Sequence, residues 1–143
     1  MSLEENKALV RRFIDKVING GKTASISEFC LENSMFAGGI EGQIKTMRMA
    51  FPDHRTTIDD ILAEGDKVAV RVTTRGTNTG PMAGFPAFGR FDTPVPPTGR
   101  KAMGSALYLF TVADGKIVSL AMEMDQIGLL RQLGWTFSPS AQA

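Results

Sequence analysis

The hydrophobic pattern changes its period along the chain, and this change limits the possible folds more than any other feature. In residues 2–19 the apolar side chains recur at the spacing of an amphipathic helix, as in Leu9, Phe13 and Val17. In residues 67–75 they alternate with polar side chains, as expected of a strand with one buried face. Helices followed by antiparallel strands predict an α+β domain, with the helices packed on one face of a sheet.

The first part of the chain predicts three helices. Ser2 and Glu5 have the spacing of a capping box, and Gly20-Gly21 is expected to end the first helix. Residues 33–42 are rich in small side chains and are predicted to be irregular. Pro52 follows the last helix, because proline cannot continue one. The three helices are expected over residues 2–19, 23–31 and 40–50.

The second part predicts antiparallel strands interrupted by one long excursion. Residues 78–99 hold most of the chain's prolines, so they cannot form a central strand. We expect them to form either a lid over a pocket or a contact between subunits. The strands are expected over residues 55–63, 67–75, 101–112 and 117–124. A helical turn over residues 126–133 then closes a single domain, residues 1–137, and residues 138–143 are predicted to form a loose tail.

Charge and composition argue against several classes of protein. Lysine and arginine total 16 against 15 acidic residues, and this balance predicts neither a nucleic-acid partner nor a membrane-binding surface. No apolar run approaches the ~20 residues that span a bilayer. Cys30 is the only cysteine, which favours a reducing, cytoplasmic location. With one cysteine and one histidine, no metal site is expected.

Several blocks of sequence, in this order, resemble the SnoaL-like polyketide cyclase family of the nuclear-transport-factor-2-like superfamily. The blocks are Glu5–Ile14, Ala50–Asp53, Ile58–Val68, Pro97–Arg100, Asp114–Val118 and Asp125–Gly134. The resemblance implies a conical barrel made of a curved, mainly antiparallel sheet and about three N-terminal helices around a pocket. It also implies a homodimer formed through the outer sheet face. Members include polyketide cyclases that catalyse an intramolecular aldol condensation without a cofactor.

The chain departs from the family where the cyclases keep their acids and bases. An Asp-His pair is usual where this chain has Phe36-Ala37-Gly38. On the last strand, a histidine and an aspartate one residue apart are common where this chain has Leu120 and Met122. Aldol chemistry needs a base for the proton beside a carbonyl and a donor for the enolate oxygen. Leucine and methionine can supply neither.

The last two strands are predicted to form an apolar wall. A type I turn with a bulged Gly115 would pair Val112 with Lys116 and turn alternate side chains inward. The expected sheet side of a ligand pocket is Tyr108, Phe110, Val118, Leu120 and Met122. The expected helical side is Phe13, Val17, Phe36 and Met47. Such a wall favours a small, apolar or polycyclic ligand. Alternatively, these side chains fill the interior as an ordinary core.

Three side chains are candidates for catalysis. Tyr108 could hold a carbonyl oxygen, and either Asp125 or His54 could move the proton. Each has a simpler interpretation, because His54 follows a Pro-Asp corner typical of the surface and Asp125 is placed to cap the terminal helix. Two functions therefore remain open: a cofactor-free, cyclase-like enzyme acting on an apolar carbonyl compound, or a non-catalytic protein that binds a hydrophobic ligand.

Overall fold

The computed structural model describes residues 1–32 and 35–140, without the side chains of residues 35 and 36. The helices are α1 (Leu3–Phe13), η1 (Ile14–Asn19), η2 (Thr23–Ser25), α2 (Ile26–Phe29), α3 (Met35–Ala50) and α4 (Gln126–Gln132). The strands are β1 (Arg55–Glu64), β2 (Lys67–Thr77), β3 (Met82–Phe85), β4 (Gly89–Val95), β5 (Lys101–Ala113) and β6 (Lys116–Met124). The predicted α+β class is confirmed.

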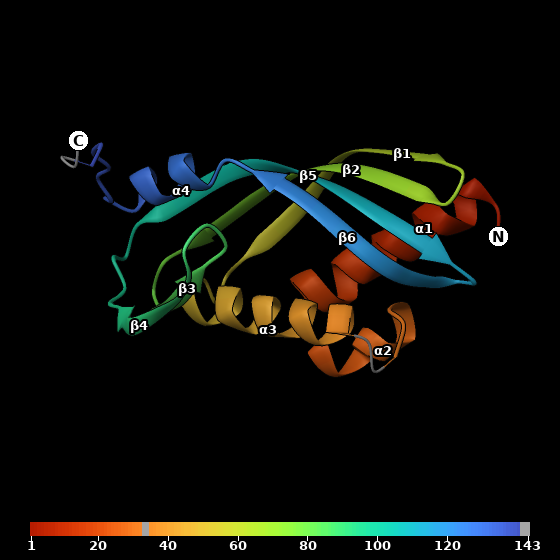
Figure 1. Ribbon diagram of the computed structural model, residues 1–143, viewed down its shortest axis with the longest axis horizontal. Coiled ribbons are helices and arrows are strands. Elements are labelled where there is room, and N and C mark those ends of the chain that lie inside the picture. Colours follow the sequence, from red (N-terminus) through yellow and green to blue (C-terminus); the bar gives the residue numbers. More distant parts are fainter. Residues whose placement is uncertain (33–34, 141–143) are drawn as a thin grey trace.

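Among the described residues, β1, β2, β5 and β6 form an antiparallel sheet in that order. No pairing joins β1 to β6, so this sheet is an open, curved layer and not a closed barrel. Figure 1 shows the sheet arching over α1, α2 and α3, with β3 and β4 below its far end. None of the described helices is both long and apolar enough to cross a membrane.

Alternation along β2 builds the sheet side of the core. Val68, Val70 and Val72 are fully buried, whereas the residues between them are partly or fully exposed. The ring of Phe13 from α1 packs edge-on against Phe110 of β5, with 6.0 Å between ring centroids. A fully buried side chain of this size contributes about 1.5–3 kcal/mol to stability. These contacts fix α1 against the concave face of the sheet.

The first helix keeps its predicted span but changes type. Ser2 and Glu5 form the capping box, and the α-helix then widens into the π-helix η1 after Phe13. Two carbonyl oxygens at the end of η1, those of Ile18 and Asn19, each accept a hydrogen bond of 3.1 Å from Nη1 of Arg48. This side chain thereby satisfies carbonyls that a helix end leaves open.

Helix α3 begins five residues earlier than the third predicted helix, so the prediction of an irregular segment over 33–42 was wrong for the described residues 35–42. Gly38 and Gly39 lower the helical propensity there. Burial of Ile40 and Ile44 against the core outweighs that loss. The predicted second helix divides into η2 and α2, and its Ile26 is buried.

The hairpin between β5 and β6 has a different turn from the predicted one. Asp114 and Gly115 both have positive φ, 50° and 75°, which gives a two-residue turn that pairs Ala113 with Lys116. Val112 pairs with Ile117, not with Lys116. The register then shifts by one residue. Because of this bulge, Ile117 is fully buried and Val118 does not face the core.

The excursion over residues 78–99 contains a hairpin of its own. Strands β3 and β4 pair only with each other among the described residues, so the excursion is not a central strand, as predicted. Behind this hairpin lies an aromatic stack from the C-terminal segment. Trp135 stacks on Phe88 with 6.0 Å between centroids and also contacts Phe91 at 5.9 Å. The stack holds the hairpin beside α3 and α4.

Candidate functional site

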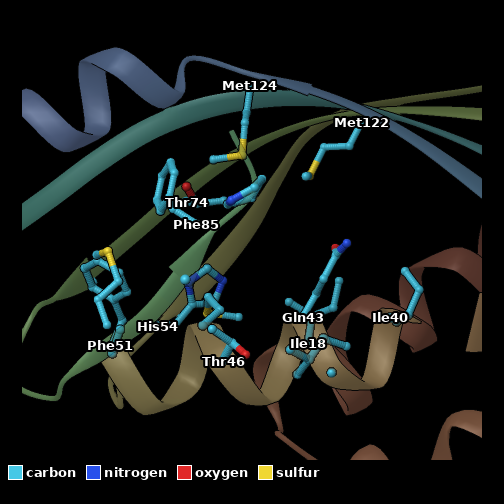
Figure 2. Close-up of a pocket in the computed structure, with 18 of the residues that line it drawn as sticks. Ile18, Ile40, Gln43, Thr46, Phe51, His54, Thr74, Phe85, Met122 and Met124 are labelled. Atoms are coloured by element: carbon cyan, nitrogen blue, oxygen red, sulfur yellow. The ribbon is translucent and has the colours of Figure 1, made fainter. Parts of the chain in front are cut away.

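A cavity of about 590 Å³ lies between the concave face of the sheet, helix α3 and the β3–β4 hairpin. This volume is in the range of pockets that hold drug-sized ligands. Figure 2 shows Met122 and Met124 pointing down from β6, while Gln43 and His54 point up from the helical side. The cavity is therefore bounded by elements far apart in sequence.

Most of the cavity wall is carbon and sulfur. Its larger apolar side chains include Phe13, Ile18, Ile40, Ile44, Met47, Phe51, Met82, Phe85, Leu120, Met122, Met124, Leu129 and Leu133. Its polar residues are Gln43, Thr46, His54, Thr74, Arg75, Arg90 and Tyr108. None of the described residues that line it is an aspartate or a glutamate. The titratable groups that remain for chemistry are an imidazole and a phenol.

His54 belongs to the cavity wall, although the Pro-Asp corner suggested the surface. The turn between α3 and β1 holds it, because its backbone N–H donates to the carbonyl of Phe51 at 3.0 Å. Its Nε2 lies 2.8 Å from Oγ1 of Thr56. Burial first, and then the positive charge of Arg48, lowers the pKa of His54 to about 4, against a smaller opposing effect of Asp53. The imidazole is therefore neutral near pH 7.

Tyr108 lies on β5 and lines the cavity from the sheet side. It is 9% exposed, and its ring packs edge-on against Phe110 at 6.1 Å. Burial raises the pKa of the Tyr108 phenol to about 12, so the hydroxyl keeps its proton. In the described part of the chain no group hydrogen-bonds to this hydroxyl, which leaves it available to a ligand oxygen.

Asp125, the second proton-moving candidate, is not part of the cavity wall. It is the N-cap of α4, and its Oδ1 accepts a hydrogen bond of 2.8 Å from the backbone N–H of Gly128. The side chain is exposed. The capping role explains its position, because the strand ends at Met124 and the next residue starts the helix.

The apolar residues expected around the pocket divide into two groups. Phe13, Met47, Leu120 and Met122 line the cavity. Val17 and Phe110 do not line it and are fully buried in the core. Val118 is also absent from the wall, because the bulge between β5 and β6 turns Ile117 inward in its place. The side chain of Phe36 lies outside the described residues.

Several wall residues were missed by sequence analysis. Gln43 lies one helical turn before Met47 on α3, so its inward direction follows from the spacing. Thr74 continues the inward face of β2 beyond Val72 in the same way. The contribution of the β3–β4 hairpin is not local, because it depends on how the excursion folds back. No metal site is evident in the described residues, where His, Cys, Asp and Glu do not gather in groups of three or more.

Comparisons with known proteins place these features in context. A family model described as SnoaL-like polyketide cyclase matches residues 8–133. Aklanonic acid methyl ester cyclase DauD of Streptomyces sp. (strain C5) is 28% identical over 140 residues, which cover 88% of this chain and 80% of DauD. Aklanonic acid methyl ester cyclase DnrD of Streptomyces peucetius is 27% identical, with 88% of each chain covered. The structure of IdmH from Streptomyces antibioticus has a TM-score of 0.72 and 25% identity, covering 91% of this chain and 99% of IdmH.

Proposed function

This chain belongs to the SnoaL-like polyketide cyclase family, and we propose that it is a cofactor-free cyclase. Its substrate would be a flat, apolar carbonyl compound that closes a ring by an intramolecular aldol reaction. Both relatives described above are named as cyclases of aklanonic acid methyl ester. That compound is therefore the first substrate to test. The family and the cyclase names do not favour the alternative of a non-catalytic binding protein.

One observation carries the proposal: a roomy apolar cavity in which His54 and Tyr108 are the titratable groups other than arginine. The apolar wall suits a fused-ring body, and the methionines of β6 can adapt to its outline. We assign the contacts with the reacting oxygen atoms and the mobile proton to His54 and Tyr108. Both are uncharged near pH 7, so they can enter the chemistry as hydrogen-bonding groups.

The test is conversion of aklanonic acid methyl ester by the purified protein, followed by chromatography and mass spectrometry. A ring closed by aldol addition has an unchanged mass and a new retention time. General acid–base groups contribute roughly 10²–10⁴-fold to rate. We expect His54→Leu to lose activity on this scale and Tyr108→Phe to lose about tenfold, the equivalent of one neutral hydrogen bond. Arg12→Gln, at an exposed position of α1 outside the cavity wall, is the matched control and should keep full activity.

Binding of fluorenone and fluorene distinguishes two explanations for a lack of turnover: the wrong substrate was chosen, or the cavity binds no ligand of this kind. Both are flat and apolar, and they differ in one carbonyl oxygen. If neither the ester is converted nor either probe binds, the proposed function is wrong. If the probes bind and compete with each other but the ester is untouched, a different carbonyl substrate is required. If His54→Leu and Tyr108→Phe both keep full activity, the assignment of His54 and Tyr108 to the reaction is wrong.

We also propose that the protein is a homodimer formed through the outer sheet face. An apolar row crosses the whole sheet there, because Leu62 pairs with Ala69, Ala69 with Leu109, and Leu109 with Ala121. Leu62 is 66% exposed and Leu109 is 42% exposed. A second copy packed on this row would remove it from water. The cytoplasmic location stays a prediction from the single cysteine.

A further inference from the structure

His54 is held by a buried residue, Thr56 at the start of β1. Only 2% of Thr56 is exposed, while the residues on either side of it are exposed. His54 immediately precedes β1, and Oγ1 of Thr56 lies 2.8 Å from its Nε2. Thr56 itself does not line the cavity. Thr56 therefore contacts the imidazole from outside the cavity.

The backbone of Thr56 is fixed by a separate pair of hydrogen bonds. Its N–H donates to Oδ1 of Asn19 at 2.7 Å, and its carbonyl accepts from Nδ2 of Asn19 at 2.8 Å. Asn19 is held in turn, since Arg48 donates to its carbonyl. These bonds serve the edge strand β1, which has no neighbouring strand on this side. They also make the Thr56 hydroxyl a fixed partner for the imidazole.

The direction of the bond between Thr56 and His54 follows from counting hydrogens. The Thr56 hydroxyl has one hydrogen, and His54 Nε2 is its only hydrogen-bond partner in the described part of the chain. If the imidazole donated instead, that hydroxyl hydrogen would be buried without an acceptor, which is unfavourable. If the hydroxyl donates, only oxygen lone pairs stay unused, and these are more easily left unpaired. Donation from the Thr56 hydroxyl to Nε2 is therefore favoured, because it leaves no buried hydroxyl hydrogen without an acceptor.

Resting on the cyclase function proposed above, we infer that Thr56 is a positioning residue that fixes His54 in the Nδ1–H tautomer, with this N–H presented to the cavity. Nε2 is occupied by Thr56, and Nδ1 has no hydrogen-bond partner among the described residues. The ring stands in the cavity in Figure 2. His54 then meets its ligand as a hydrogen-bond donor. Arg48 on α3 and Asp53 in the preceding turn are the charged groups that act on it.

This assignment has a consequence for the substrate. With the donors His54 and Tyr108, and no described carboxylate on the wall, the site suits a substrate that brings its own nucleophile as an enol. The enol carbon attacks the acceptor carbonyl, whose oxygen is held by the donors. The C=C π electrons of the enol form the new C–C bond, the π electrons of the acceptor carbonyl move to its oxygen, and the enol C–O becomes a carbonyl. The enol O–H proton passes to the oxygen of the new alcohol, so no external base is consumed.

The single histidine makes the assignment directly measurable. A long-range ¹H–¹⁵N spectrum of the uniformly labelled protein at neutral pH contains one imidazole, and its pattern reports the tautomer. We expect the Nδ1–H pattern in the wild-type chain. Thr56→Val, which keeps the shape and removes the hydroxyl, should shift the pattern towards Nε2–H. Thr56→Ser should restore it if the hydroxyl is the cause. Thr57→Val, an exposed neighbour on the same strand, is the matched control and should change nothing.

A second measurement tests whether the N–H faces the cavity. Fluorenone should shift the His54 Nδ1 signal, and fluorene should not, because only fluorenone has an oxygen to accept the bond. A wild-type Nε2–H pattern, or an Nδ1–H pattern that persists in folded Thr56→Val, would overturn the inference. Neither result depends on turnover, so the tautomer can be wrong while the cyclase function holds. Equally, if the spectra are as expected but the protein converts no substrate, the result counts against the cyclase function and not against the tautomer.

Discussion

Replacing His54 by glutamine should make folding stability less sensitive to mild acid. In the folded chain the pKa of His54 is about 4, against an ordinary value of 6.5. The unfolded chain therefore binds more protons than the folded chain between these two values, and wild-type stability falls as the pH drops through this window. Above the ordinary value both states are neutral and the histidine has no pH-dependent effect. The lost stability grows until the pH reaches the folded-state value.

The magnitude follows from the two pKa values of this one group. At about pH 5 the linkage relation gives a loss of about 2 kcal/mol relative to about pH 8. With a urea m-value of roughly 1–3 kcal/mol per molar, the wild-type midpoint should fall by about 1 M more than the midpoint of His54→Gln. The contribution of the aspartates and glutamates to the pH dependence cancels in this comparison, since both proteins carry them. Glutamine can still hydrogen-bond Thr56, so packing changes little.

The assay is urea unfolding followed by the fluorescence of Trp135, the only tryptophan, across that pH range. The reasoning would be refuted if wild-type and variant midpoints moved in parallel. That result would mean that His54 titrates in the folded chain as it does in water, and therefore that it is exposed to solvent. Changing Asp53 to asparagine provides an internal check. It removes the opposing charge and should lower the pKa of His54 further, widening the window.

Three further outcomes are expected. Trp135→Ala removes the stack behind Phe88, so the β3–β4 hairpin should loosen and fluorenone affinity should fall by roughly tenfold, as measured by titration calorimetry. Leu109→Glu should convert the proposed dimer to monomer in sedimentation experiments, while Leu3→Glu, an equally exposed leucine on α1, should not. Gly42→Ala should raise the free energy of unfolding by about 1 kcal/mol, because alanine favours a helix and its Cβ meets open space.

The parts of the fold that could be predicted are those that depend only on the spacing of residues within a short stretch of sequence. The alternation of Val68, Val70 and Val72 reveals a buried strand face without reference to any other element. The Ser2 and Glu5 spacing reveals the start of a helix for the same reason. The pairing beside the hairpin turn at Asp114-Gly115 was predicted wrongly, because one extra residue changes the register and moves Val118 off the inward face. Small local differences in a turn therefore decide which residues line the cavity.

The site was predicted less well, because burial depends on contacts between distant segments. His54 follows a corner typical of the surface, yet the hairpin and α3 enclose it. Asp125 was considered as a base because it follows the strand that carries Met122. Its capping bond to Gly128 uses the carboxylate for helix geometry instead. A pattern of residue types can propose candidates, but only the tertiary contacts of His54 and Asp125 distinguish chemistry from structure.

The glycines of α3 explain both the wrong helix start and the empty space. Gly38, Gly39 and Gly42 line the cavity, and a Cβ added to any of them would meet nothing within 4 Å. Each glycine inside a helix costs about 1 kcal/mol relative to alanine. A helix selected only to support a solid core would gain by replacing all three. Their presence weakens the local helix signal, and the same absence of side chains leaves room beside Gln43 and His54. The feature that reduced helix propensity is thus the same feature that leaves this side of the cavity empty.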